Sequence, residues 1–196
     1  MTQEKIVLSL LNENNGYLTT KEALKNNVSG ETLRRMLKRN LIDRVSYGLY
    51  VRTDIFPDRF FIAQFRCSKG VFSHLTALYL HGYSDRDPVR LTMTVPKGAN
   101  TKSFKDENII FYYSEQKRMK LGLSEIVNLS GMKVSVYDIE RTICDCIKYI
   151  DKLDRDLILT GLKRYLRSDS KDSMKLLEYA TELNIRNIVH RYLEVL

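Results

Sequence analysis

The densest group of chemically competent side chains is a run of four cations within six residues. These cations are Arg34, Arg35, Lys38 and Arg39. Arginine can form two hydrogen bonds with guanine, and lysine supplies positive charge to phosphate groups, so this combination suits the major groove of DNA. Glu31 lies three and four residues before Arg34 and Arg35, however, and such pairs also stabilise ordinary surface helices. The cations alone therefore leave both interpretations open.

A second polar group lies in the segment "VYDIERTICD", residues 136–145. Asp138, Glu140 and Asp145 could bind the metal ion of a nuclease. Asp138 is also a good N-cap, and Glu140 in the first turn of the following helix would complement its dipole. Asp138 and Glu140 are two residues apart, so they should not share a helix face. We expect a structural role for these carboxylates. We also expect the protein to have no catalytic and no metal-binding residues.

A zinc site is a further possibility, formed by His74 and His81 with Cys144 and Cys146. The C-x-C spacing differs from the usual C-x2-C, and small buried thiols are common. We therefore expect His74 to be packed or part of a capping turn, and no cofactor to be bound. The segment "PKGAN", residues 96–100, could form a basic anion-binding loop, but a plain turn is favoured.

Length and composition narrow the class of protein. The chain has 196 residues, 43% of them hydrophobic, which is enough for one large or two small folded domains. The formal net charge is +8, which favours an anionic partner such as nucleic acid. Three cysteines without a framework spacing predict a reducing compartment. No segment is typical of a signal peptide or a membrane span, so we expect a soluble cytoplasmic protein without a membrane partner.

The elements that must position the cations follow from periodicity and capping. An amphipathic helix over Ile6–Leu11 should end at Asn14–Gly16, and Thr19 with Glu22 has the capping-box spacing for a helix over 20–27. Ser29 is a good N-cap for a third helix ending near Asn40. Its predicted buried stripe is Leu33, Met36, Leu37 and Leu41. Strands over 42–45 and 49–51, joined by a turn at Tyr47-Gly48, complete the order of a winged helix-turn-helix.

The rest of the chain predicts a small sheet with helices. We expect a connector over 54–59, a short helix over 60–67, a helix capped by Ser73 and closed by Gly82, and strands in 90–96, 108–113 and 125–138. Four helices should follow, over 138–150, 154–167, 172–183 and 185–195. The predicted fold class is α+β, with a winged helix-turn-helix at 1–53, a connector at 54–59, and a mixed α/β domain with a helical C-terminus at 60–196.

Six segments in this order resemble the AbiEi family, the antitoxins of the AbiE abortive-infection (type IV toxin–antitoxin) systems of bacteria. The segments are "GYLTTKEA", "LIDRVSYGLYV", "FSHLTALYLHGYSDRDP", "MTVPKGAN", "VYDIERTICD" and "YATELNIRNIVHRYLEVL". The resemblance implies an N-terminal winged helix-turn-helix joined to a C-terminal antitoxin domain. It implies repression of the protein's own promoter through inverted repeats. It also implies neutralisation of a nucleotidyltransferase-like toxin of the AbiEii type without a stable complex.

By this resemblance, "TTKEA" lies on the first helix of the DNA-binding pair and "SGETLRRMLKRN" on the recognition helix. The hairpin turn could approach the DNA backbone or the minor groove. The predicted DNA-contacting residues are Thr19, Thr20, Lys21, Ser29, Thr32, Arg34, Arg35, Lys38, Arg39, Arg44, Ser46 and Tyr47. We expect a DNA-binding autorepressor and antitoxin that is not an enzyme. The alternatives are a DNA-directed metal-dependent nuclease and a toxin-binding module without sequence-specific DNA binding.

Overall fold

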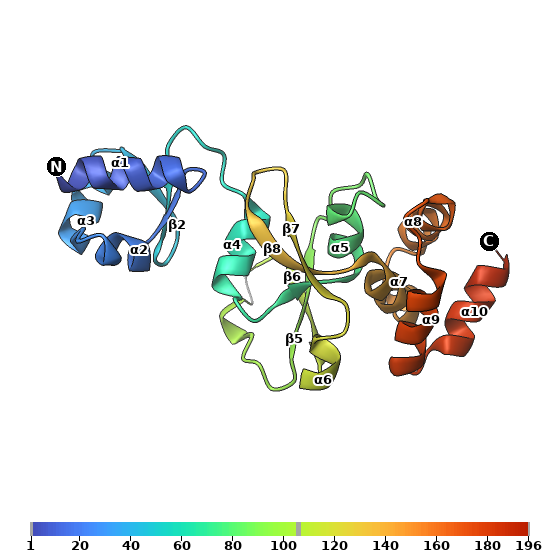
Figure 1. The fold of residues 1–196 in the computed structure, drawn as a ribbon. Coiled ribbons are helices and arrows are strands. Elements are labelled where there is room, and N and C mark those ends of the chain that lie inside the picture. The colour runs from blue at the N-terminus through green and yellow to red at the C-terminus, as the bar shows by residue number, and fades with distance from the viewer. Residues whose placement is uncertain (1, 105–106, 196) are drawn as a thin grey trace. The chain divides into compact units, whose positions relative to one another are not determined.

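The computed structural model describes residues 2–104 and 107–195 and has a mixed α+β fold with two β-sheets (Figure 1). The chain forms two compact units. The first contains residues 1–67 and 129–132, and the second contains residues 68–128 and 133–196. Within the described ranges, no helix combines the length and the hydrophobicity needed to cross a bilayer.

The first unit combines four helices with a three-stranded sheet. Its elements are α1 (Gln3–Glu13), β1 (Tyr17–Thr19), α2 (Thr20–Lys25), α3 (Gly30–Lys38), β2 (Ile42–Ser46), β3 (Leu49–Arg52) and α4 (Arg59–Arg66). The sheet is antiparallel with the order β1-β3-β2. The expected three helices and hairpin are therefore confirmed as elements of secondary structure.

Local sequence signals explain where α2 and α3 begin and where α1 ends. Thr19 and Glu22 form the predicted capping box of α2, and the Ser29 hydroxyl accepts from the Thr32 amide at the start of α3. After α1 the backbone turns through positive φ at Asn15 and Gly16. A Cβ at Gly16 would overlap the Ile55 side chain, so a glycine is needed there for its conformation and for space.

The core of the first unit is formed by the inner faces of α1, α2 and α3 against β1 and β2. Its buried residues are Val7, Leu11, Leu18, Ala23, Val28, Leu33, Met36 and Ile42. The predicted stripe of α3 is correct at Leu33 and Met36, which are buried, and Leu37 is half-buried. The prediction is wrong at Leu41, which is 37% exposed, because α3 ends at Lys38 and the helical spacing no longer applies.

Helix α4 belongs to the first unit, although the sequence analysis assigns it to the domain over 60–196. Phe61 packs edge-on against the ring of Tyr17 at 4.8 Å between centroids. The Tyr17 hydroxyl accepts from the Asp58 amide at 2.7 Å. The compact units consequently divide near residue 67, beyond the predicted connector at 54–59.

The second unit is built on a five-stranded mixed sheet with the order β6-β5-β4-β8-β7. Its strands are β4 (Val71–Phe72), β5 (Leu91–Pro96), β6 (Ile109–Ser114), β7 (Leu123–Val127) and β8 (Lys133–Tyr137). β5 and β6 are parallel, as are β4 and β8, whereas the β4–β5 and β7–β8 pairs are antiparallel. β4 was not predicted, because two residues are too few to show an alternating pattern.

Two helices of this unit, α5 and α6, lie between strands in the chain, and four more, α7 to α10, follow the sheet and form the C-terminal part (Figure 1). They are α5 (His74–Leu80), α6 (Gln116–Met119), α7 (Ile139–Lys148), α8 (Arg155–Arg167), α9 (Ser173–Glu182) and α10 (Arg186–Val195), with short 3-10 turns at Lys102–Phe104 and Ile150–Lys152. The four predicted C-terminal helices are confirmed, and the single-turn α6 was not predicted. Buried residues of α7, α8 and α9 form one core, which includes Ile143, Leu162 and Leu176.

Candidate nucleic-acid interface

The four cations of the opening run lie on the solvent side of α3. The side chains of Arg34, Arg35 and Arg39 are 69%, 55% and 56% exposed. Lys38 is also exposed. Leu33 and Met36 on the opposite side are buried, so the helix is held by its apolar face while its long donors project into solvent.

The cations have carboxylate neighbours of two kinds. Arg34 pairs with Glu31 on its own helix at 2.7 Å, as the spacing predicts. Arg35 pairs instead with Glu4 of α1 at 3.3 Å, and Arg39 lies 3.0 Å from the same carboxylate. Exposed pairs of this kind contribute only about 0.2–1 kcal/mol, so an approaching phosphate can replace them at small cost. Lys38 makes no ion pair with the residues that the structure describes.

The start of α2 lies beside the turn of the β2–β3 hairpin. The Thr20 amide donates to the Gly48 carbonyl at 2.9 Å. Gly48 has a φ of +76°, which favours glycine at this turn. The Thr19 hydroxyl is occupied by the capping box, whereas Lys21 is exposed. The structure thus brings the predicted residues 19–21 close to the predicted hairpin residues.

The hairpin presents an exposed aromatic and a cation. Tyr47 is 87% exposed, and the Arg44 guanidinium lies 5.1 Å from the centre of its ring. The register of β2 and β3 shifts between Arg44 and Ser46, which is the geometry of a β-bulge. Ser46 is half-buried, and its carbonyl accepts from Arg44 Nε at 3.4 Å. Tyr47 and Arg44 are therefore available to a partner, while Ser46 offers little surface.

Thr32 does not lie on the outer face of α3 as expected. It is 4% exposed, and its hydroxyl donates to Gln3 Oε1 at 2.5 Å. The Ser29 hydroxyl donates to the same Gln3 oxygen at 3.1 Å. These bonds fix the start of α3 against α1, so we remove Thr32 from the candidate interface. Ser29 remains exposed, with its hydroxyl already engaged.

Two polar residues of this region were not predicted from the sequence. Gln3 and Glu4 begin α1, yet their partners lie on α3. No spacing rule connects positions so far apart in the chain. A polar pair at the start of an amphipathic helix was the only available signal, and it is common to many surface helices.

The carboxylates of the second unit have protein partners in place of a metal ion. Asp138 caps α7 through the Arg141 amide at 2.9 Å. Lys175 Nζ lies 3.0 Å from Asp138 Oδ2 and 3.1 Å from Glu140 Oε2. The two carboxylates are thus joined through a cation from α9. Burial opposes the charge of Lys175, but its hydrogen bonds to both carboxylates outweigh that cost and raise its pKa.

Two tyrosines and an arginine also bond the carboxylates of this group. Tyr179 donates to Asp138 Oδ2 at 3.1 Å, and Tyr165 donates to Glu140 Oε1 at 3.2 Å. Asp145 instead pairs with Arg141 at 3.0 Å. Among the described residues, no group of three His, Cys, Asp or Glu side chains has metal-binding geometry. The arrangement is therefore that of a stabilising network.

The histidines and cysteines considered as zinc ligands have other environments in the structure. Burial raises the pKa of Cys144 to about 12 and that of Cys146 well above its usual value, so both remain neutral thiols. His81 Nε2 bonds the Tyr137 carbonyl at 2.7 Å. His74 is buried, as expected. Ser73 precedes α5, but its hydroxyl does not cap the helix; it bonds His74 Nδ1 at 2.9 Å.

Comparison with known proteins shows a likeness of fold. The chain is similar to the RV2827C protein from Mycobacterium tuberculosis, whose crystal structure matches with a TM-score of 0.54 at 9% sequence identity, over 94% of this chain and 76% of that chain. At this identity the likeness concerns the fold alone. No family model and no curated protein matches the sequence.

Proposed function

We propose that this protein is a DNA-binding autorepressor and antitoxin of the AbiEi type, and that its first unit is a winged helix-turn-helix. The observation that supports DNA binding best is the exposed cationic side of α3, held by a buried apolar face. A helix of this kind fits the major groove, where base edges and phosphates offer acceptors to arginine and lysine. In this proposal α3 is the recognition helix and the β2–β3 hairpin is the wing.

The proposed contacts follow from exposure and charge. Arg34 and Arg35 bond base edges, because they project from the middle of α3 and form only weak pairs with carboxylates. Lys38, without an ion-pair partner among the described residues, contacts phosphate. Arg44 and Tyr47 on the wing approach the DNA backbone or minor groove. Lys21 contacts phosphate from the start of α2.

The antitoxin role rests on the resemblance of the six sequence segments to the AbiEi family. In this proposal the protein acts in the cytoplasm, binds inverted repeats in its own promoter, and counters a nucleotidyltransferase-like toxin without a stable complex. A nuclease role is disfavoured, because Asp138 and Glu140 are bridged by Lys175. A toxin-binding module without DNA binding leaves the cationic side of α3 unexplained.

The test of DNA binding is a gel-shift salt titration with the duplex upstream of the protein's own gene, against an unrelated duplex of equal length. We expect tight, stepwise binding to the upstream duplex, as two half-sites are filled. The double variant Arg34→Ala/Arg35→Ala should lose about 1–3 kcal/mol per base contact together with sequence preference. Lys38→Ala should weaken binding to both duplexes and reduce the salt slope by about one.

The matched control removes two cations from the second unit. Lys163 and Arg167 are exposed on one face of α8, so Lys163→Ala/Arg167→Ala changes the net charge equally. This control should retain specific binding. Equal affinity of the folded Arg34/Arg35 variant and the wild type for the upstream duplex would refute the interface. Equal, salt-sensitive binding of wild type to both duplexes would refute autorepression.

The antitoxin role needs a separate test in cells. The toxin gene is expressed from one inducible promoter and this protein from another, so that repression cannot influence toxin levels. We expect growth to be restored by the wild type and by Arg34→Ala/Arg35→Ala. Co-purification of a stable complex would overturn the proposed indirect mode of neutralisation, and continued growth arrest would overturn the antitoxin role.

A further inference from the structure

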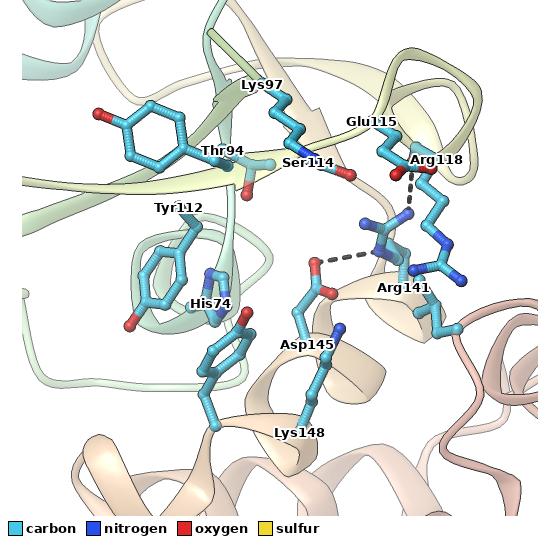
Figure 2. Close-up of a pocket in the computed structure, with 13 residues that line it drawn as sticks. His74, Thr94, Lys97, Tyr112, Ser114, Glu115, Arg118, Arg141, Asp145 and Lys148 are labelled. Carbon is cyan, nitrogen blue, oxygen red and sulfur yellow. Dashed lines mark hydrogen bonds and ion pairs between the residues drawn. The ribbon is translucent and has the colours of Figure 1, made fainter. Parts of the chain in front are cut away.

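A cavity of about 290 Å³ lies in the second unit, at the carboxyl ends of β5 and β6 and beside α5 and α7 (Figure 2). The two strands are parallel, and the last residues of each, Pro96 and Ser114, are paired. Parallel strands of open sheets bind ligands outside their carboxyl ends, where loops and helix starts converge. The cavity therefore lies where an α/β sheet is suited to hold a small molecule.

One wall of this cavity contains an unsatisfied histidine. His74 is 2% exposed and adopts a φ of +50°, an uncommon conformation for a residue other than glycine. The Thr94 hydroxyl donates to Ser73 Oγ at 2.9 Å, which leaves the Ser73 hydrogen for His74 Nδ1. With the Ser73 hydroxyl donating to His74 Nδ1, the ring proton lies on Nε2, which has no partner among the described residues. A buried donor without an acceptor costs about 1–3 kcal/mol, and a bound acceptor would recover that cost.

The opposite wall is a fixed ion pair. Arg141 bonds Asp145 at 3.0 Å and the carbonyls of Arg118 and Leu121 at 2.8 and 3.0 Å. These bonds hold its guanidinium rigidly and neutralise Asp145. Burial raises the pKa of Asp145, and the adjacent guanidinium offsets part of this effect. A second anion near Arg141 would therefore meet a preorganised donor group and not a mobile side chain.

The charges around the cavity are strongly unbalanced. Its charged lining residues are Lys97, Arg118, Arg141, Lys148, Glu115 and Asp145, which is an excess of two positive charges. Figure 2 shows Lys97 and Lys148 approaching from opposite sides, with His74 and Arg141 on the other two. Burial, with the nearby charges of Arg141 and Lys148, lowers the pKa of His74 to about 3, so the histidine is a neutral donor at pH 7.

We propose that this cavity binds a phosphate monoester, with its dianionic head group between Lys97, Lys148 and Arg118 and an oxygen accepting from His74 Nε2. A phosphate monoester matches the excess of two positive charges, because its second pKa is about 6 and it therefore carries close to two negative charges at pH 7.5. A phosphodiester has a single charge and is the poorer match. The volume suits the phosphate and a small attached group, since it lies near the lower end of the range for ligand pockets, about 300–1,000 Å³. This site is independent of the DNA interface on α3.

The test is isothermal titration calorimetry of the full chain with ribose 5-phosphate at pH 7.5 and constant ionic strength. We expect saturable binding of one molecule per chain, and at least tenfold weaker binding of dimethyl phosphate as the diester probe. Lys97→Ala/Lys148→Ala should lower the affinity for ribose 5-phosphate about tenfold or more. Both lysines are exposed on the rim, so this variant should fold normally.

The matched control is Lys133→Ala/Lys163→Ala, which removes two exposed lysines of the same unit away from the cavity. It should bind as the wild type does. A second variant, His74→Asn, tolerates the positive φ and should weaken binding without a change of net charge. Absence of saturable binding to the wild type, or equal affinity of the Lys97/Lys148 variant and the control, would overturn the proposal.

The source of the phosphate monoester can be distinguished with nucleic acid. A trinucleotide with a 5′-phosphate is compared with the same trinucleotide lacking it, so that contacts to diester phosphates cancel. A gain in affinity that depends on the terminal phosphate and on Lys97 and Lys148 would support a nucleic-acid end as the ligand. Binding of ribose 5-phosphate without such a gain would support a free small molecule.

Discussion

His74 should make the second unit sensitive to mild acid. In the folded chain its pKa is about 3, against an ordinary value of 6.5, because burial and the charges of Arg141 and Lys148 disfavour the protonated ring. As the pH falls below about 6.5, the unfolded chain therefore takes up a proton at this position and the folded chain does not. The contribution of the neutral His74 ring to the free energy of unfolding is complete above about pH 6.5 and is lost progressively between about pH 6.5 and pH 3.

The magnitude follows from the separation of the two pKa values. Each pH unit between them is worth about 1.4 kcal/mol, so a fall from about pH 7 to about pH 5 should remove about 2 kcal/mol of stability. In the variant His74→Asn, the side chain at this position takes up no proton in this range. The variant also loses the stacking of the His74 ring on Tyr112, which lowers its stability equally at every pH. The difference in free energy of unfolding between wild type and variant should shrink by about 2 kcal/mol over this interval.

The assay is urea denaturation at several pH values in phosphate-free buffer. Because the chain has no tryptophan, unfolding is followed by far-ultraviolet circular dichroism and tyrosine fluorescence. The charged groups around His74, namely Asp145, Arg141 and Lys148, are present in both proteins. A wild-type-minus-variant difference that stays constant within about 0.5 kcal/mol would refute the reasoning.

Two further predictions concern the buried ion pairs and the cysteines. Lys175→Met should lower the free energy of unfolding by about 2–3 kcal/mol, because the buried Glu140 loses its cation and the partial exposure of Lys175 moderates the effect. Adding Glu140→Gln to the same chain should recover part of this loss. Both changes are measured by urea denaturation. A loss below about 0.5 kcal/mol would contradict this role. In a thiol titration of the native chain, the partly exposed Cys67 should react first, and Cys144 and Cys146 should react only on denaturation. Rapid reaction of all three thiols would contradict the burial of Cys144 and Cys146.

Much of the local structure was predictable, because short-range chemistry determines it. Thr19 with Glu22 and Ser29 cap α2 and α3 as their spacing predicts. Asp138 caps α7 in the same way. These bonds join residues three positions apart, so the chain forms them in any fold that contains the helix.

The candidate interface was only partly predictable. The exposure of Arg34, Arg35 and Lys38 follows from the helical period. The burial of Thr32 does not, since it depends on Gln3 of another helix. Extending the same period predicted that Leu41 is buried. Leu41 is exposed, because α3 ends before it. Periodicity thus identifies faces within a helix and fails where a partner or a helix end intervenes.

The sequence by itself determined most of the helices and strands, the caps of α2, α3 and α7, and the dense positive charge of α3, because these depend on neighbours in the chain. Only the tertiary structure decided that Lys175 joins Asp138 to Glu140, and that Lys97 and Lys148 meet His74 around one cavity. "PKGAN" forms the turn that its sequence favours, yet its lysine reaches this cavity because Pro96 and Ser114 end adjacent parallel strands. Contacts between distant segments require the packing of the whole sheet and its helices, which no local pattern encodes.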